Sequence, residues 1–328
     1  MYMQEMIWFV GVVEDNNDPA KLGRLKVRCL GYHTENKNDL LTSDLPWASV
    51  MQPITSAAMQ GIGQSPTGIV QGTHVVGFFR DGKYAQDPVV MGTLAGASGE
   101  QPKGIFGFED PDKKYPGTSR ASISGLATHT SGDINPLATG DGHTKIDTDR
   151  GTDPITDAKI ANTTDVWPEP TSTRAATYPN NHVMETESDH VKEYDDTPKN
   201  ERIHEYHTAG TFYEIDSEGN KFTKIMKDHY TVVLGKDYVY VKGGVNLTID
   251  NNCNTYIKGD WNIQVDGDKV EVVTGAVTET YKDTKTETVT GTVSETYESS
   301  QTTNITGNLN LDASINIDID AEGQIDLN

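Results

Sequence analysis

Glycine recurs at intervals of eight residues through the last third of the chain. This spacing is too long for a heptad and too short for the repeat of a helical solenoid. Glycine tolerates a positive φ and allows another backbone to approach closely, so each glycine is suited to a tight corner. In four skipped slots stand Asn251, Asp283, Ser299 and Ile315. The predicted repeat corners are Gly235, Gly243, Gly259, Gly267, Gly275, Gly291, Gly307 and Gly323.

A β-branched or aromatic residue stands two positions before each slot from 235 to 307, with polar residues beside it. This alternation is typical of a half-buried strand, and such residues favour extended backbone. Each unit is therefore predicted to be a short strand that ends at a corner. The inward residues of this V slot are predicted to be Val233, Val241, Ile249, Ile257, Val265, Val273, Val289 and Ile305, with Tyr281 and Tyr297 in two further slots.

An eight-residue turn supplies too few apolar side chains to enclose a core of its own. Ordering one residue costs about 1 to 2 kcal/mol, whereas a buried valine returns only about 1.5 to 3 kcal/mol. Identical chains wrapped about one axis would supply the missing walls and would remove free sheet edges. The repeat therefore predicts an obligate homotrimer with an intertwined, triple-stranded β-helix.

The slot two positions after the corner holds mostly apolar side chains. Among the residues that do not suit an interior are Lys269, Lys285 and Gln301. They indicate either a hydrated or ion-filled stretch of the axis or side chains that point outward at a distorted corner. Glutamates four positions after the corners form an acidic ladder that is typical of a solvated face. The ladder comprises Glu271, Glu279, Glu287 and Glu295.

Composition narrows the class of protein. Of 328 residues, 34% are hydrophobic, which is few for a large globular core but suits a shaft with a narrow interior. The net charge of -22 argues against a nucleic-acid partner, because phosphate binding needs clustered lysine and arginine.

Cys29 and Cys253 lie far apart and are expected to be reduced and buried. The first residues, MYMQEMIWFV, predict neither a signal peptide nor a membrane span.

Four segments differ in character. Residues 1–98 predict a small Greek-key barrel of the oligonucleotide/oligosaccharide-binding (OB) kind, without helices. Residues 99–178 predict an extended linker that gains order by lying against neighbours. Residues 179–226 predict antiparallel strands or a collar that brings the chains into register, and 227–328 form the octad-repeat spike. The barrel strands are expected at Ile7 to Val13, Arg24 to Leu30, Trp47 to Met51, His74 to Phe79 and Val89 to Leu94. The fold class is thus all-β.

Three parts of the chain resemble a known family in the same order: the N-terminal barrel, the segment before the octads and the octads themselves. FVGVVEDNNDPAKLGRLKVRCLGYH, at residues 9–33, resembles the N-terminal barrel of the central spike protein of contractile phage tail baseplates, as do LPWASVMQPITSA, GIVQGTHVVGFFRDG and DPVVMGTLAG. ETESDHVKEYDDTPKNERIHEYHTAGTFYEIDSEGN, at residues 185–220, is similar to the segment before the spike in that family and in the valine-glycine-repeat protein of type VI secretion. With the octads, the resemblance covers most of the chain outside 99–178.

The resemblance implies a trimeric cell-puncturing device in the tail baseplate of the virion. Hub proteins of the tail tube would hold the barrel, the β-helix would point at the host envelope, and a separate small tip protein would cap the C-terminal end. Some family members carry a muramidase between barrel and spike. Here that region is only about 80 residues of loop-like composition, too few apolar residues for a lysozyme core. We therefore expect neither enzyme activity nor a cofactor.

Several motifs admit a chemical interpretation. Glu109, Asp110 and Asp112 supply carboxylates for a reduced peptidoglycan hydrolase, the enzyme-class alternative, but no apolar pocket is evident around them. His204 and His207, with His182 and His190 upstream, suggest a zinc site, although residues three apart on a strand face opposite ways. DIDAEG, at 318–323, imitates the start of a calcium loop but also fits plain strand alternation. No metal site is therefore predicted.

Two further functions stay open. A carbohydrate-binding fibre is compatible with an OB barrel on a trimeric shaft, and glycan binding by residues 1–98 would favour it. Trp8 and Trp47 are expected in the barrel core and not on a sugar platform. A type VI secretion spike would share the same mechanism, but the short barrel, with no large hub domain in front of it, favours a phage.

Overall fold

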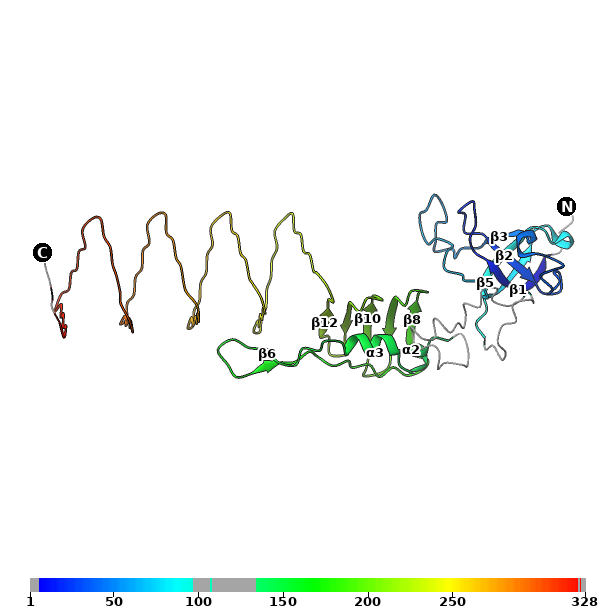
Figure 1. Ribbon diagram of the computed structural model, residues 1–328. Helices are drawn as coiled ribbons and strands as arrows, with labels where there is room; N and C mark the ends of the chain where they lie inside the picture. The colour runs from blue at the N-terminus through cyan, green and yellow to red at the C-terminus, as the bar shows by residue number, and fades with distance from the viewer. Residues whose placement is uncertain (1–5, 97–106, 108–133, 324, 326–328) are drawn as a thin grey trace. The chain divides into compact units, whose positions relative to one another are not determined.

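The computed structural model describes residues 6–96, 107, 134–323 and 325. Within these residues the fold is mostly β, with one closed barrel, one antiparallel sheet and a short hairpin (Figure 1). No helix in the described part is long and apolar enough to cross a membrane.

The N-terminal strands close a five-stranded barrel in the order β1-β2-β3-β5-β4. All pairs are antiparallel except β3 with β5, which is parallel. The predicted OB barrel is therefore confirmed, with each strand within two residues of its expected bounds. The strands are β1 (Ile7–Asp15), β2 (Leu25–Cys29), β3 (Trp47–Val50), β4 (His74–Phe79) and β5 (Pro88–Thr93). Two 3₁₀ turns, η1 (Thr42–Asp44) and η2 (Gly82–Tyr84), lie in the loops.

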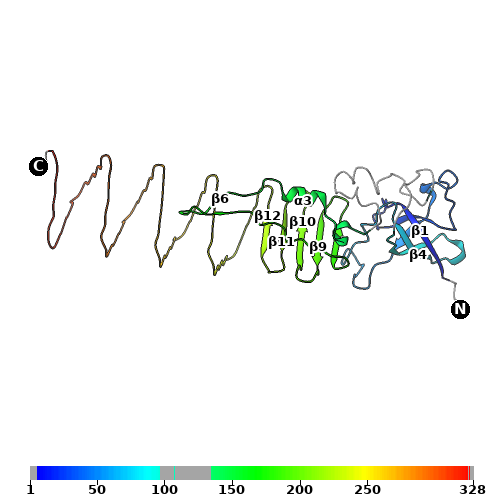
Figure 2. The ribbon, with the colours of Figure 1, turned by 90° about the horizontal axis from the view of Figure 1, so that it is seen from below.

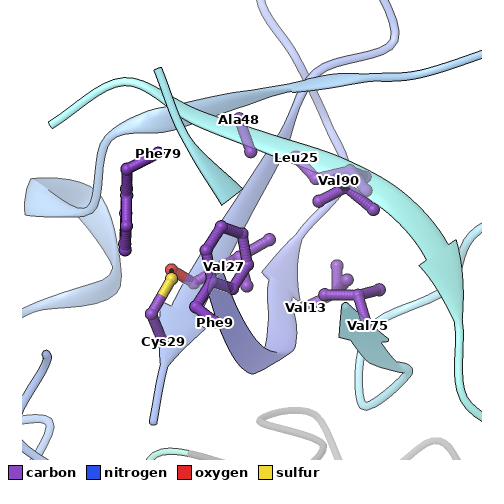
Figure 3. Close-up of a cluster of buried hydrophobic side chains, with 9 residues drawn as sticks. All are labelled: Phe9, Val13, Leu25, Val27, Cys29, Ala48, Val75, Phe79 and Val90. Atoms are coloured by element: carbon purple, nitrogen blue, oxygen red, sulfur yellow. Dashed lines mark hydrogen bonds between the residues drawn. The ribbon is translucent and has the colours of Figure 1, made fainter. Parts of the chain in front are cut away.

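Alternate residues of these strands point inward and fill the barrel (Figure 3). The Phe9 and Phe79 rings lie 4.8 Å apart between their centroids. At Gly77 the neighbouring strand comes so close that a Cβ atom would lie 2.1 Å from the Val89 carbonyl oxygen. Glycine at this position thus permits the approach of β4 to β5. The buried cluster comprises Phe9, Val13, Leu25, Val27, Cys29, Ala48, Val75, Phe79 and Val90.

Residues 181–224 form the second sheet, a meander in which every neighbouring pair is antiparallel. We call it the collar sheet. It confirms the prediction of antiparallel strands before the octads. Its strands are β8 (Asn181–Glu185), β9 (Val191–Asp195), β10 (Arg202–Tyr206), β11 (Phe212–Ile215) and β12 (Lys221–Lys224).

Two short helices cover one face of the collar sheet, as Figures 1 and 2 show. They are α2 (Pro136–Thr139) and α3 (Thr144–Arg150). Leu137 and Ile146 are buried against Val191, Tyr206 and Phe212 of the sheet.

These helices depart from the expectation of an extended linker and from the all-β class. The Asn135 side chain accepts a hydrogen bond from the Leu137 amide at 2.9 Å, and Pro136 occupies the first turn. His143 Nδ1 accepts from the Ile146 amide at 3.3 Å. Local caps and one or two apolar anchors therefore suffice for a helix that sparse hydrophobicity does not reveal.

After α3 the chain makes a hairpin of two-residue strands, β6 (Ala158–Lys159) and β7 (Val166–Trp167). Beyond β12 the character changes. Residues 225–323 are all described, and none belongs to a helix or a paired strand. In a single chain, therefore, the predicted β-helix is absent.

Candidate functional site

The backbone of the octads bends at intervals of eight residues from 234–235 to 322–323. Bends occur at every glycine of the predicted corner set and also at the four slots where glycine is missing. No atom outside the adjacent residues lies within 4 Å of a Cβ built on any of those glycines. The corners of a single chain are therefore open, and their role in an assembly stays a prediction.

The V-slot side chains are half exposed along the whole repeat. Their exposed fractions run only from 42% at Ile257 to 51% at Val265 and Val289. Tyr240 and Tyr256, in another slot of the same repeat, are 89% and 87% exposed. Each V-slot side chain is therefore an apolar group that the chain itself covers by about half.

Over its described residues, the backbone of the octads also lacks the ladder of hydrogen bonds that a sheet would provide. Within residues 225–323 no backbone-to-backbone hydrogen bond forms. Each amide and carbonyl that becomes buried needs a partner, because an unpaired buried group costs as much as a lost hydrogen bond. A single chain offers an unpaired edge on both sides of every strand-like segment.

Two of the polar exceptions pair with the acidic ladder. Lys269 Nζ lies 2.8 Å from Glu271, and Lys285 Nζ lies 4.0 Å from Glu279 and 3.7 Å from Glu287. The hydrogen bond from Lys269 lowers the pKa of Glu271. All these groups are exposed, so each pair contributes little to stability. This arrangement favours the outward-facing interpretation of the two lysines.

The collar sheet encloses a charged network beneath its helices. Arg202 Nη2 donates to Glu193 Oε2, and Nη1 donates to Glu214 Oε2, both at 2.8 Å. Arg150 Nη2 donates to the same Glu214 oxygen at 2.8 Å, and its guanidinium stacks over the Phe212 ring at 4.5 Å. Glu193, Arg202 and Glu214 are nearly fully buried. Sequence reasoning missed this network.

The Glu193 carboxylate also interacts with Asn181 and His204. Its Oε2 accepts from Asn181 Nδ2 at 2.8 Å, and its Oε1 lies 2.9 Å from His204 Nδ1. Burial alone would raise the pKa of Glu193, but the bond from His204 and the charge of Arg202 lower it to about 2. A general acid needs the opposite shift, so this environment does not suit Glu193 to that role.

The four histidines considered for a zinc site do not converge. His204 lies under the helices beside Glu193, whereas His207 is exposed and its ring packs at a tilt against that of His190, with 4.6 Å between the ring centroids. His182 lies on the edge strand, 3.4 Å from Asp196. The described residues contain no cluster of three or more His, Cys, Asp or Glu side chains arranged to hold a metal. Glu109, Asp110 and Asp112 lie outside the described residues.

One ion pair is buried in the barrel. Arg28 Nε and Nη2 donate to the two carboxylate oxygens of Glu14 at 2.5 and 3.1 Å. The same guanidinium donates to the carbonyls of Thr34 and Leu40, each at 2.7 Å. These bonds fasten the loop after β2 to the barrel wall.

The burial of the cysteines and tryptophans agrees only in part with the prediction. Cys29 is buried as predicted, and burial raises the pKa of its thiol to about 12. Cys253 is exposed in the single chain, so its predicted burial is wrong there. Trp8 is 53% exposed, which corrects its assignment to the core, and its ring contacts Phe78 edge-on. Trp47 is partly buried under Arg24 and Lys26.

The loop from β3 to β4 is unusual in its lack of charge. No Asp, Glu, Lys or Arg occurs in residues 45–79, although 23% of the chain is charged. Ile54, Met59 and Ile62 project from this loop with most of their surface exposed. Exposed apolar residues without nearby charge mark a surface suited to a protein partner.

Comparison with known proteins agrees with the OB barrel. Residues 31–203 match the family model of the Gp5 N-terminal OB domain, and this match covers more than half of the chain. The chain belongs to the phage Gp5 central spike family.

Two relatives extend this assignment. Protein Gp5 of Vibrio phage KVP40 is 38% identical to this Gp5-family chain over 265 residues, which cover 74% of the chain and 63% of that protein. The pre-baseplate central spike protein Gp5 of Enterobacteria phage T4 is 50% identical over 121 residues, or 35% of the chain and 21% of that protein. The chain thus spans less than two thirds of either relative.

Proposed function

We propose that three copies of this chain form the central spike of a contractile tail baseplate, a needle that punctures the host envelope. In this proposal the octads wind into an intertwined, triple-stranded β-helix. The observation that carries it is that half-exposed V-slot side chains coincide with a backbone that forms no backbone-to-backbone hydrogen bond within residues 225–323.

Energetic reasoning supports three chains over one. Ordering eight residues costs about 8 to 16 kcal/mol, which one valine worth about 1.5 to 3 kcal/mol cannot offset. The same contact between neighbouring chains would bury the apolar V slots and pair the open backbone amides and carbonyls. Mechanical load on the spike would be shared among many interchain hydrogen bonds.

The uncharged loop supports a docking role for the barrel. We assign the tail hub to the loop that carries Ile54, Met59 and Ile62, because exposed apolar side chains in a segment without charged residues suit a protein interface. By family resemblance, a small tip protein caps the far end of the octads. The protein then belongs to the virion and acts through shape and rigidity, without a cofactor or nucleic acid.

Native mass measurement tests the assembly. The intact protein is expected at three times its chain mass of 35.9 kDa, and boiling in detergent is expected to release monomer. A native monomer would refute the needle. Lysis of peptidoglycan in a zymogram, abolished by replacing Glu109, Asp110 or Asp112, would instead favour the hydrolase alternative.

A further inference from the structure

The hairpin 155–169, which contains β6 and β7, is anchored at its base to the last collar strand (Figure 1). Lys224 Nζ donates to Glu169 Oε1 at 3.1 Å and to the carbonyls of Arg150 and Thr152 at 3.2 and 2.8 Å. The Glu169 amide donates to the Ile155 carbonyl at 2.6 Å. Lys224 and Glu169 are both largely buried, so the base is firmly held.

The far part of the hairpin forms hydrogen bonds with the octad residue Thr248. The Thr248 hydroxyl donates to the Lys159 carbonyl at 2.7 Å, and the indole N–H of Trp167 donates to the Thr248 hydroxyl at 3.5 Å. Strands of two residues do not persist in water without support. Here the support comes from Lys224 at one end and Thr248 at the other.

The identity of Thr248 distinguishes its octad from the adjacent ones. Eight residues before it stands Tyr240 and eight residues after it stands Tyr256, both turned to solvent. A slip of one repeat in either direction would bring a phenol ring against Lys159 and Trp167, where a small hydroxyl now fits. The contact therefore discriminates between repeats that are otherwise alike.

We propose that this hairpin is a register clasp that binds the second octad of its own chain at Thr248. Self-similar repeats slip easily, because a shift by one period preserves most contacts between neighbouring segments. A non-repeating element that accepts only one octad removes this ambiguity where the shaft begins. The inference rests on the proposed trimeric shaft and adds the element that sets its register.

Cross-linking between engineered cysteines tests the clasp. In the full chain carrying Cys253→Ser, the pair Lys159→Cys and Thr248→Cys is treated with a short bismaleimide. The matched controls place the second cysteine one octad away, as Tyr240→Cys or Tyr256→Cys. We expect efficient cross-linking only with position 248, and we expect the product to run as a monomer after boiling.

The outcomes separate the two proposals. Equal cross-linking at 240, 248 and 256, or none at 248 in a native trimer, would overturn the clasp alone. Dimer and trimer bands from the 248 pair would overturn its assignment to the same chain. A native monomer in the mass measurement would refute the shaft itself.

A second pair of variants tests the hydrogen bond of the Thr248 hydroxyl by itself. Thr248→Val removes the donor at nearly constant volume, and Thr248→Ser retains it. We expect hairpin amides in the valine variant to exchange with solvent several-fold faster, with the serine variant close to the parent. Equal exchange in all three proteins would show that the hydrogen bond does not hold the hairpin.

Discussion

Arg202 and Glu193 are joined by a 2.8 Å hydrogen bond inside the collar sheet, where both side chains are almost fully buried. The two residues lie on adjacent antiparallel strands, and Arg202 also bonds Glu214. Charged groups at this depth are tolerated only when they are paired and hydrogen-bonded. The sheet that precedes the octads is therefore held by an ionic core as well as an apolar one.

Replacing the arginine should loosen this sheet. Arg202→Met leaves two buried carboxylates without their shared cation, and breaking such a pair costs about 3 to 5 kcal/mol. Hydrogen exchange of the β9 and β10 amides should accelerate strongly. Lys192→Ala is the control, since its contact with Glu205 is 3.9 Å long and exposed. Similar exchange in both variants would contradict an important role for the buried pair.

Acid should weaken the same network. The pKa of Glu193 is lowered from 4.5 to about 2 in the folded chain, so its contribution is present above about pH 4.5 and is lost as pH falls toward 2. Glu193→Gln should remove this part of the pH dependence. Exchange of the β9 amides, measured between pH 5 and pH 2 and corrected for intrinsic rates, gives the comparison. Parallel pH profiles for both proteins would assign the acid sensitivity to other groups.

The barrel offers a test of close packing. Gly77→Ala places a methyl group against the Val89 carbonyl and the Phe9 ring, and overpacking of this kind costs about 1 to 3 kcal/mol. We expect a lower midpoint for barrel unfolding, followed by tryptophan fluorescence. Gly92→Ala is the matched control, because no atom lies within 4 Å of its added Cβ. An unchanged midpoint for Gly77→Ala would mean that β4 shifts at little cost.

Sequence patterns predicted the elements that follow a period. The barrel strands alternate strictly enough that His74 to Phe79 is predicted to the residue, and the bends of the octads coincide with the predicted slots. The helices α2 and α3 were missed because their formation depends on caps and on burial of Leu137 and Ile146 against a distant sheet. Local composition does not contain that tertiary contact.

The charged network of the collar sheet was not predicted, for a related reason. Glu193 in VKEYD and Arg202 in RIHEY are charged residues within short strands that mix charged and apolar residues. Such charged positions are normally interpreted as the solvent-exposed face of a strand. The burial of these two residues follows from the helices α2 and α3, which pack on this face of the sheet from a segment more than forty residues away. The signal available in sequence was the opposite charge of two residues on adjacent strands of a short hairpin, where Glu193 is the diagonal neighbour of Arg202. This would have suggested an ion pair but not its burial.

The V slots of the octads give the most direct test of the proposed spike. Val273→Asp would put three carboxylates near one axis, where burial of unpaired charge is costly. We expect this variant to lose the detergent-resistant trimer and to appear as monomer or aggregate in native mass measurements. Thr274→Asp is the control, since the adjacent position is polar in the repeat and is expected to face solvent. If both variants kept the trimer equally well, the V slots would not line a shared interior.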